Sequence, residues 1–367
     1  MKILLVSDGS FLREVIVPKA RALLDRGHEV ALLIRDHARD FGGDERERAK
    51  ALDAVGIRVL ELPDRRHDRG NPQAIASARK AIQAWDPDIA SVHENTDPRL
   101  FFLLRSIPVV YTIHDPVPHS GATMPRLPFR WVPRAWVKRA SRIVVHGPQL
   151  VEEVRRFRKP RCPIDVIPLG ADVKDSPYPL PARRAILMFG RMEPYKGLSV
   201  LAEAMPLVWA TQPETELVVA GRGPSLTDLP EHLVSDGRVT VIDRYVSDSE
   251  REELLRRATV CVLPYIDASQ SGVGVLGISR GIPTVVTDTG GLPELVSDPS
   301  LVCEPSNPDA LADSLTTALE LDNQARVAVL RHAKKNFSWP SIAKEYEGVL
   351  QMSQTAPEAP TPPRAPS

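Results

Sequence analysis

Cysteine is scarce in this sequence, with only three in 367 residues. Cys162, Cys261 and Cys303 lie far apart and form neither a C-x-x-C pair nor a Cys/His cluster with metal-ligand spacing. This excludes a disulfide framework and a structural zinc site as the basis of the fold. Reduced thiols of this kind are typical of a cytoplasmic protein.

An excess of charge of one sign is also missing, because Lys+Arg and Asp+Glu both total 47. The sequence therefore offers no overall electrostatic argument for nucleic-acid binding. No apolar run approaches the length of a membrane-spanning helix. The short N-terminal run 3–6 is interrupted by Asp8 before it reaches signal-peptide length. We expect a cytoplasmic protein, at most peripheral to the inner face of the membrane.

What the sequence does contain is an alternation of short apolar runs with longer helical patterns, which predicts parallel strands with crossover helices. The chain is long enough for two domains. We therefore expect an α/β protein with two Rossmann-like doubly wound domains facing a central cleft, where such sheets bind ligands. The expected strands are 3–6, 29–34, 57–61, 88–93, 109–114 and 142–146 in the first sheet, and 185–189, 216–220, 238–242, 259–263 and 284–287 in the second.

Proline-rich sequence after a short strand near 164–170 indicates a linker between the domains. We expect a first domain at 1–172 and a second domain at 173–335. Residues 307–335 and 341–352 have helical patterns, and 336–352 is expected to pack back on the first domain. The tail at 353–367, with five prolines, is expected to be disordered.

The loop Gly190–Gly197 follows an expected strand and precedes an expected helix. Gly190 allows a tight turn, while Arg191 and Lys196 place two cations at the carboxyl end of the strand. Such a pair suits a diphosphate. Without further signals, a solvated strand-to-helix loop would explain the same residues.

A second loop lies between the buried strand 259–263 and a helix that is expected to end near Gly281. Its small and polar residues are typical of a helix start whose free N–H groups face an anion, although small residues also permit close helix packing. The residues are Ser269, Gln270, Ser271, Gly272 and Val273. In a third loop, 287–294, a glycine pair turns the chain, and Glu294 is expected to open or cap the next helix.

These motifs together resemble the retaining GT-B glycosyltransferases of family 4. The string 190–197 is similar to the family's G-R-x-x-x-x-K-G signature. Residues 219–224, 245–248 and 285–294 resemble its second-domain turn, its base-binding segment and its donor loop, and 167–172 resembles the segment that joins its domains. The resemblance covers most of residues 1–350 in order and spacing.

The resemblance implies that the domain at 1–172 binds the acceptor and the domain at 173–335 binds the nucleotide sugar, and it also implies roles for individual residues. Arg191 and Lys196 would hold the donor diphosphate, the helix start at Gly272 would cradle it, and the backbone near Val246 would meet the base. Gly190, Gly221 and Val273 complete the expected donor site.

The chain departs from the family where two glutamates eight residues apart are usual, because Ala268 and Leu276 stand there, and Asp267 could replace the first glutamate only with a one-residue slip. It resembles a subgroup with a Ser-Gln-Ser-Gly-Val loop. In that subgroup Ser269, Gln270 and Ser271 would recognise the sugar.

Two histidines follow successive strands of the first domain at their carboxyl ends, His93 and His114. A histidine there could hydrogen-bond the sugar or the acceptor in the transition state, whereas a lone histidine more often satisfies a local hydrogen bond. By resemblance, His114 occupies the family's cleft-histidine position and is expected to be catalytic. Gly9, in the first loop, is a weaker candidate because the usual glycine pair is missing.

A basic segment between 116 and 151 contains six cations and no carboxylate. Arg130, Arg134 and Lys138 recur every four residues and would line one helix face, with Trp131 and Trp136 placed for a lipid interface. An ordinary basic, solvated helix with core tryptophans explains the pattern equally well. The other cations of the segment are Arg126, Arg139 and Arg142.

The sequence thus predicts a glycosyltransferase that moves a sugar from a nucleoside diphosphate donor to a hydroxyl acceptor, with retention implied by the resemblance. The acceptor would be a glycolipid, a polysaccharide or a small molecule, and a lipid-linked acceptor would suit contact with an anionic membrane. We expect neither a metal nor another cofactor, and no nucleic-acid partner. A GT-B epimerase and a non-catalytic GT-B partner subunit remain as alternatives.

Overall fold

The structure is a computed structural model that describes residues 1–7, 12–35, 52, 55–62, 72–94, 97–116 and 131–354. It divides into two compact units, which are described separately. The described residues of the first unit lie within 1–116, 131–167 and 342–354, and those of the second within 168–341.

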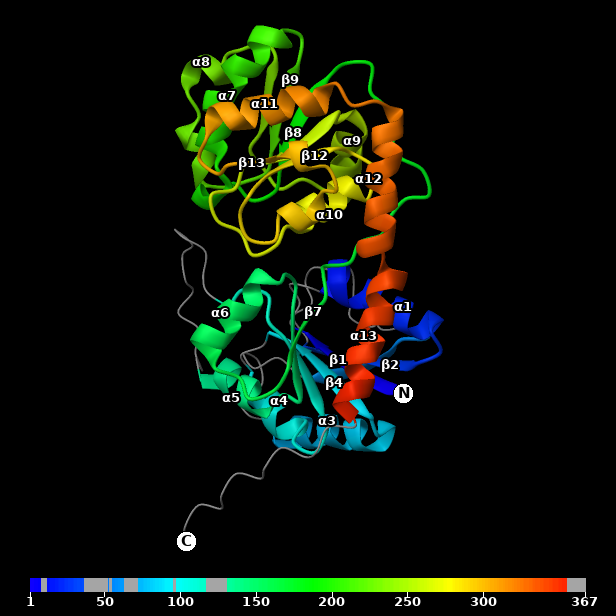
Figure 1. Ribbon diagram of the computed structural model, residues 1–367. Coiled ribbons are helices and arrows are strands. Elements are labelled where there is room, and N and C mark those ends of the chain that lie inside the picture. The colour runs from blue at the N-terminus through cyan, green and yellow to red at the C-terminus, as the bar shows by residue number, and fades with distance from the viewer. Residues whose placement is uncertain are drawn as a thin grey trace. The chain divides into compact units, whose positions relative to one another are not determined.

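The first unit is built on a seven-stranded parallel sheet in the order β3-β2-β1-β4-β5-β6-β7 (Figure 1). Its strands are β1 (Lys2–Ser7), β2 (Glu29–Arg35), β3 (Arg58–Leu62), β4 (Ile89–His93), β5 (Val109–Thr112), β6 (Arg142–Val145) and β7 (Ile164–Val166). Its helices are η2 (Leu12–Ile16), α1 (Val17–Asp25), α3 (Pro72–Trp85), α4 (Pro98–Leu103), α5 (Trp131–Arg139), α6 (Gln149–Arg158) and, for most of its length, α13 (Trp339–Gln354).

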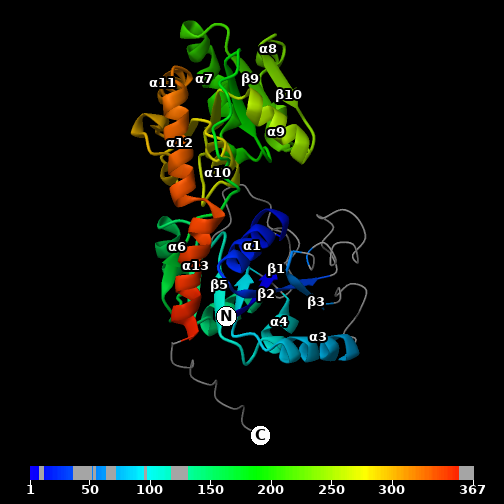
Figure 2. The same ribbon diagram turned by 90° about the vertical axis from the view of Figure 1, so that its right-hand side faces the viewer.

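The central strands of the first unit, β4 and β5, are buried throughout, as expected for parallel strands covered by helices on both faces. Alternate residues therefore support two separate layers. Ala90 and Val92 face the cluster that contains α3, α4, α5 and α6. Ser91 turns to the other face, where it hydrogen-bonds Tyr346 of α13. Figure 2 shows α1 and α13 side by side.

The second unit has a six-stranded parallel sheet in the order β10-β9-β8-β11-β12-β13. Its strands are β8 (Ala185–Phe189), β9 (Glu216–Ala220), β10 (Val239–Ile242), β11 (Val260–Leu263), β12 (Thr284–Thr287) and β13 (Val302–Cys303). Its helices are α7 (Leu198–Thr211), α8 (Glu231–Val234), α9 (Asp248–Arg257), α10 (Gly272–Ile278), α11 (Pro308–Leu319) and α12 (Asn323–Asn336), with short turns η4 (Pro194–Lys196), η5 (Pro224–Asp228), η6 (Pro293–Leu295) and η7 (Pro299–Leu301).

Alternation along β8 again separates two layers. Ile186 and Met188 pack with α7 and α11, whereas Leu187 packs against α9 and α10. A third cluster joins α10 to α12 around Val275, Ala333 and Phe337. The expectation of two α/β domains with parallel sheets is confirmed.

Both sheets reverse their strand order at one place. In the first, the chain runs outward from β1 in one direction and from β4 in the other, and in the second the corresponding neighbours are β8 and β11. Ligands of open α/β sheets bind outside the carboxyl ends of the strands at such a switch point. The loops after β1, β4, β8 and β11 are therefore the places to look for a site.

Several local expectations need correction. The stretch 307–335 is two helices, because Asp322 caps α12 by accepting a hydrogen bond from the Ala325 amide. The last helix begins at Trp339 and not at 341. The two-residue strand β13 had no signal in the sequence because its pattern is too short to show periodicity. The three cysteines are free. Most of the tail expected to be disordered lies outside the described residues.

Candidate functional site

The loop after β8 brings the first predicted residues together. Gly190 has a φ of 118°, and a Cβ there would lie 3.3 Å from Lys196 Nζ and 3.2 Å from Val273 Cγ2. Gly221, after β9, approaches the same turn so closely that an added Cβ would overlap the Gly190 carbonyl oxygen at 1.8 Å. Glycine is needed at Gly221 because any side chain there would collide with the Gly190 backbone, and at Gly190 because residues with a side chain rarely adopt its φ.

Lys196 is buried at the end of the turn η4 and points at the loop after β11. Its Nζ donates a hydrogen bond of 3.0 Å to the Tyr265 hydroxyl and lies 4.8 Å from the centre of the Tyr265 ring. The Tyr265 oxygen is in turn 3.3 Å from Ser271 Oγ. This polar chain joins the two loops of the β8–β11 switch point. Nothing in the sequence pattern singled out Tyr265.

Ser271 caps α10, because its Oγ accepts a hydrogen bond from the Gly274 amide. The Val275 amide donates the first hydrogen bond within the helix, to the Ser271 carbonyl. The Gly272 and Val273 amides precede it and have no hydrogen-bond partner in the described part of the chain. Gly272 is exposed. The expected helix start is confirmed, but α10 ends at Ile278, three residues before Gly281.

Gln270 is the most unusual polar residue of this loop. Its Oε1 and Nε2 are both buried and have no hydrogen-bond partner among the described residues. A buried amide without partners costs roughly 1 to 3 kcal/mol, so such groups are rare unless a ligand or water completes them. The neighbouring Ser269 is also buried.

Arg191, Val246 and Glu294 differ in their surroundings from Lys196. Arg191 is exposed, and no ion pair or hydrogen bond ties it to another described side chain. Val246 is buried, whereas Tyr245 before it is exposed. Ser247 after it caps α9 through a capping box. Glu294 neither opens nor caps a regular helix, because it lies in the short turn η6, whose N-cap makes no side-chain bond. Burial raises the pKa of the Glu294 carboxyl.

In the first unit, His114 follows β5 and belongs to a buried cluster. Its Nε2 is 3.1 Å from His93 Nδ1, and its ring centre is 4.7 Å from that of His146. Lys19 of α1 completes the group, with Nζ 2.6 Å from His93 Nε2. Burial and the neighbouring cationic groups lower the pKa values of His93 and His114 well below the usual range, so both imidazoles are neutral near pH 7. Lys19 and His146 were not anticipated from the sequence.

A pair of carboxylates lies beside the histidines, at the carboxyl ends of β4 and β5. Burial and the nearby Asp115 raise the pKa of Glu94 to about 7, against the effect of hydrogen bonds from the His114 and Asp115 backbone amides. A carboxyl with this pKa can exchange a proton near neutral pH. Gly9, the remaining candidate of this unit, lies outside the described residues.

The basic segment is only partly the amphipathic face that its spacing suggested. Trp131, Arg134 and Lys138 are exposed on α5. Trp136, however, is completely buried, and its ring packs against Tyr111. It is two residues from each of the exposed cations Arg134 and Lys138, so it lies on a different face of the helix. Its assignment to a lipid interface was wrong.

Two further cations of this segment have structural partners. Arg139 donates to the Leu104 and Ile107 carbonyls, and Arg142 pairs with Asp165 at 2.7 Å. Arg126 and Arg130 lie outside the described residues. Of the expected basic face, the two members that the structure describes, Arg134 and Lys138, are exposed.

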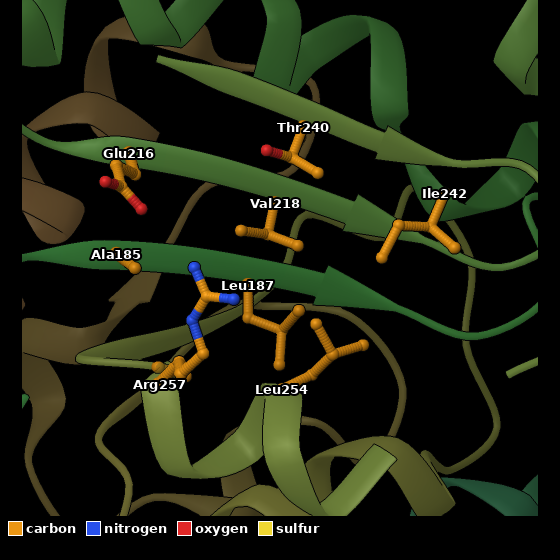
Figure 3. Close-up of a pocket in the computed structure, with 9 residues that line it drawn as sticks. Ala185, Leu187, Glu216, Val218, Thr240, Ile242, Leu254 and Arg257 are labelled. Carbon is orange, nitrogen blue, oxygen red and sulfur yellow. The ribbon is translucent and has the colours of Figure 1, made fainter. Parts of the chain in front are cut away.

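A small pocket on the second sheet is separate from the candidate residues. It lies between α9 and the strands β8, β9 and β10 and is mainly apolar, with Glu216 and Arg257 near the amino ends of the strands (Figure 3). Its volume of about 80 Å³ is well below the roughly 300 Å³ or more of typical ligand pockets. It is too small for a nucleotide sugar.

Within the described part of the chain, no group of three or more His, Cys, Asp or Glu side chains is arranged to hold a metal ion. The helices described here also include none that is long and apolar enough to cross a membrane.

Comparisons with known proteins agree with this arrangement. Residues 15–175 match the model for Glycosyltransferase Family 4, and residues 183–321 match that for Glycosyl transferases group 1. The chain is 25% identical over 367 residues to the phosphatidyl-myo-inositol mannosyltransferase of Mycolicibacterium smegmatis, covering 92% of this chain and 88% of that protein. It is 30% identical over 179 residues to an uncharacterized glycosyltransferase of Methanocaldococcus jannaschii, a match that spans 45% of that protein's length.

The fold is similar to that of Anabaena HepE, solved in complex with UDP and glucose, with a TM-score of 0.66, 18% identity and coverage of 96% of this chain and 100% of that chain. The two matched domains follow each other in the order of the two parallel sheets. The chain is therefore a glycosyltransferase of the GT-B type, with a family 4-like domain followed by a group 1 domain.

Proposed function

We propose that the chain transfers a sugar from a nucleoside diphosphate donor to a hydroxyl acceptor, with retention at the anomeric carbon, and that the donor binds at the β8–β11 switch point. The observation that carries the proposal is the chain from Lys196 through Tyr265 to Ser271, beside the unpartnered Gln270 amide. A buried cation held in place by neutral groups keeps its charge available for a diphosphate.

In this proposal the residues of the second unit divide the donor between them. Lys196, Arg191 and the amides of Gly272 and Val273 neutralise the diphosphate, which makes a metal unnecessary. The Gln270 amide, with Ser269, recognises sugar hydroxyls in place of the family's glutamates. The backbone around Val246 meets the base. That HepE was solved with UDP and glucose supports a nucleoside diphosphate as the ligand class.

In the first unit, His114 hydrogen-bonds the sugar or the acceptor. A retaining transfer passes through an oxocarbenium-like transition state, which depends more on stabilisation of the departing diphosphate than on a strong base. A neutral imidazole suits this role. Hexoses are the proposed sugars.

A lipid-linked acceptor and a peripheral membrane contact complete the proposal. The acceptor named for the mycobacterial relative is a phosphatidylinositol lipid, and α5 exposes Trp131, Arg134 and Lys138. An aromatic ring and cations together suit the interface of an anionic membrane.

The first experiment is a thermal-shift panel of nucleoside diphosphates and their sugars, because a ligand that binds only the folded state raises the apparent stability. A stabilising donor is then incubated with and without lipid, polysaccharide and small-molecule acceptors, and products are identified by mass spectrometry. We expect acceptor-dependent sugar transfer. Conversion of the donor to an epimer without acceptor, or the failure of every nucleoside diphosphate to stabilise the protein, would refute the proposal.

A further inference from the structure

Three buried side chains in the first unit form a continuous path that ends at His114. Lys19 Nζ lies 2.6 Å from His93 Nε2, and His93 Nδ1 lies 3.1 Å from His114 Nε2. Lys19, His93 and His114 are exposed by 3%, 1% and 8%, so water does not compete for these contacts. Each link joins one nitrogen to one nitrogen, and a proton must lie between them on one side or the other.

The first link has a direction because an ammonium group can only donate. Lys19 also lies 4.1 Å from the centre of the Tyr346 ring, and an aromatic face favours the charged form of lysine. Burial acts against this and lowers the Lys19 pKa to about 7, so the ammonium form is present below neutral pH. His93 Nε2 therefore accepts, and the proton of the neutral His93 ring is on Nδ1.

The second link follows from the first. His93 Nδ1–H donates to His114 Nε2, which must then be the unprotonated nitrogen of His114. Because His114 is neutral, its single ring proton is on Nδ1. Whatever meets Nδ1 of His114 therefore meets a hydrogen-bond donor and not a base.

His146 provides an independent reference within the same cluster. Its Nδ1 lies 2.9 Å from the Ile167 carbonyl oxygen, which can only accept, so His146 also carries its proton on Nδ1. Neither atom of this bond belongs to Lys19 or His93. A change at Lys19 should leave the His146 tautomer as it is.

We propose that Lys19 is a positioning residue that, through His93, holds the imidazole proton of His114 on Nδ1 and so makes His114 a hydrogen-bond donor during sugar transfer. The part about transfer rests on the proposed function, whereas the tautomer does not. At metal sites, loss of the partner that fixes a histidine tautomer costs roughly ten- to a hundredfold in metal affinity or activity, and we expect an effect toward the lower end of that range here.

The direct test is nitrogen-15 NMR of the histidine rings in the full chain at about pH 6, with signals assigned by single His→Gln variants. In the wild type, His114 should show one tautomer with the proton on Nδ1. In Lys19→Met, which cannot donate, the His114 signals should become those of a mixture of both tautomers, while His146 remains unchanged. Lys19→Arg, which can only donate, should restore the single tautomer.

Two NMR results would overturn the proposal. One is a wild-type His114 that carries its proton on Nε2, and the other is a Lys19→Met variant in which His114 keeps its single Nδ1 tautomer. An unchanged His146 signal shows that the variant is folded.

The activity test separates this proposal from the proposed function. Lys19→Met should lower kcat about tenfold with little change in KM for the donor, and Lys80→Met, at an exposed position on α3, should change neither. An altered tautomer with unchanged kcat would overturn the role of Lys19 in transfer. If the wild type transfers no sugar, but the wild type and Lys19→Met both show the expected tautomers, the proposed function fails and the control of His114 by Lys19 is supported.

Discussion

Replacing Tyr265 by phenylalanine removes one oxygen from the second unit and keeps the ring beside Lys196. That oxygen accepts the hydrogen bond from Lys196 Nζ and also contacts Ser271 Oγ. Without it, the lysine keeps the contact with the ring face, centred 4.8 Å away, but loses the group that fixes its direction. Ser271, the N-cap of α10, also loses the contact between its hydroxyl and the Tyr265 oxygen.

The expected loss in affinity follows from one charge-assisted hydrogen bond. Such a bond contributes roughly 1.5 to 3 kcal/mol, and part of it is recovered when the freed ammonium group binds the diphosphate directly. We expect nucleoside diphosphate affinity to fall by about three- to tenfold, equivalent to roughly 0.7 to 1.4 kcal/mol.

The assay is calorimetric titration of the nucleoside diphosphate, with Tyr346→Phe as the matched control. Tyr346 is also a buried tyrosine whose hydroxyl is bonded, at 2.6 Å from Ser91 Oγ, but it lies in the first unit. Both variants should lower the melting temperature by a few degrees, whereas only Tyr265→Phe should weaken nucleotide binding. Equal nucleotide affinity in the two variants would refute the argument that Tyr265 orients Lys196.

Three further predictions concern other parts of the molecule. Gln270→Leu should raise the free energy of unfolding, measured with urea, by about 1 kcal/mol, because it removes an unpartnered buried amide. In calorimetric titration it should weaken binding of the nucleotide sugar but not of the parent nucleoside diphosphate, and equal losses of affinity for both ligands would contradict this prediction. The wild-type free energy of unfolding should rise between about pH 7 and pH 10 by up to roughly 1.4 kcal/mol per pH unit, because Lys19 keeps a proton in the unfolded chain that it has lost in the folded protein. Lys19→Met should lack this contribution, and urea unfolding that gives the same pH dependence of the free energy for both proteins would contradict the prediction. The double variant Arg134→Glu, Lys138→Glu should co-sediment less with anionic vesicles than the wild type at low salt, since each cation contributes about 1 kcal/mol near such a surface; equal sedimentation would exclude α5 as the membrane contact.

The sequence was sufficient for the two parallel sheets because each strand is a short, continuous apolar run bounded by turn residues. It was also sufficient to place Lys196 near Ser271, since both follow strands that the fold brings to one switch point. Strand-end position is a topological property, and the order of the runs is enough to infer it.

The contacts between side chains were harder to predict from the sequence, because they depend on which face of a helix or strand turns toward the core. The four-residue spacing of Arg130, Arg134 and Lys138 was visible, but nothing in the pattern showed that Trp136 packs on Tyr111. Tyr265 and Lys19 were missed for a related reason. Each lies within an apolar segment, where a tyrosine or a lysine stem is ordinarily a packing residue.

Calorimetric titration of the nucleoside diphosphate into Lys196→Ala, Arg191→Ala and Arg191→Lys, with and without a chelator, tests the central claim most directly. Each alanine variant should bind about ten- to a hundredfold more weakly than the wild type, and Arg191→Lys should restore affinity only in part, because an ammonium group cannot reproduce the planar fork of arginine. The chelator should have no effect. Loss of wild-type binding on chelation, or alanine variants that bind as tightly as the wild type, would contradict a metal-independent diphosphate site at the β8–β11 switch point.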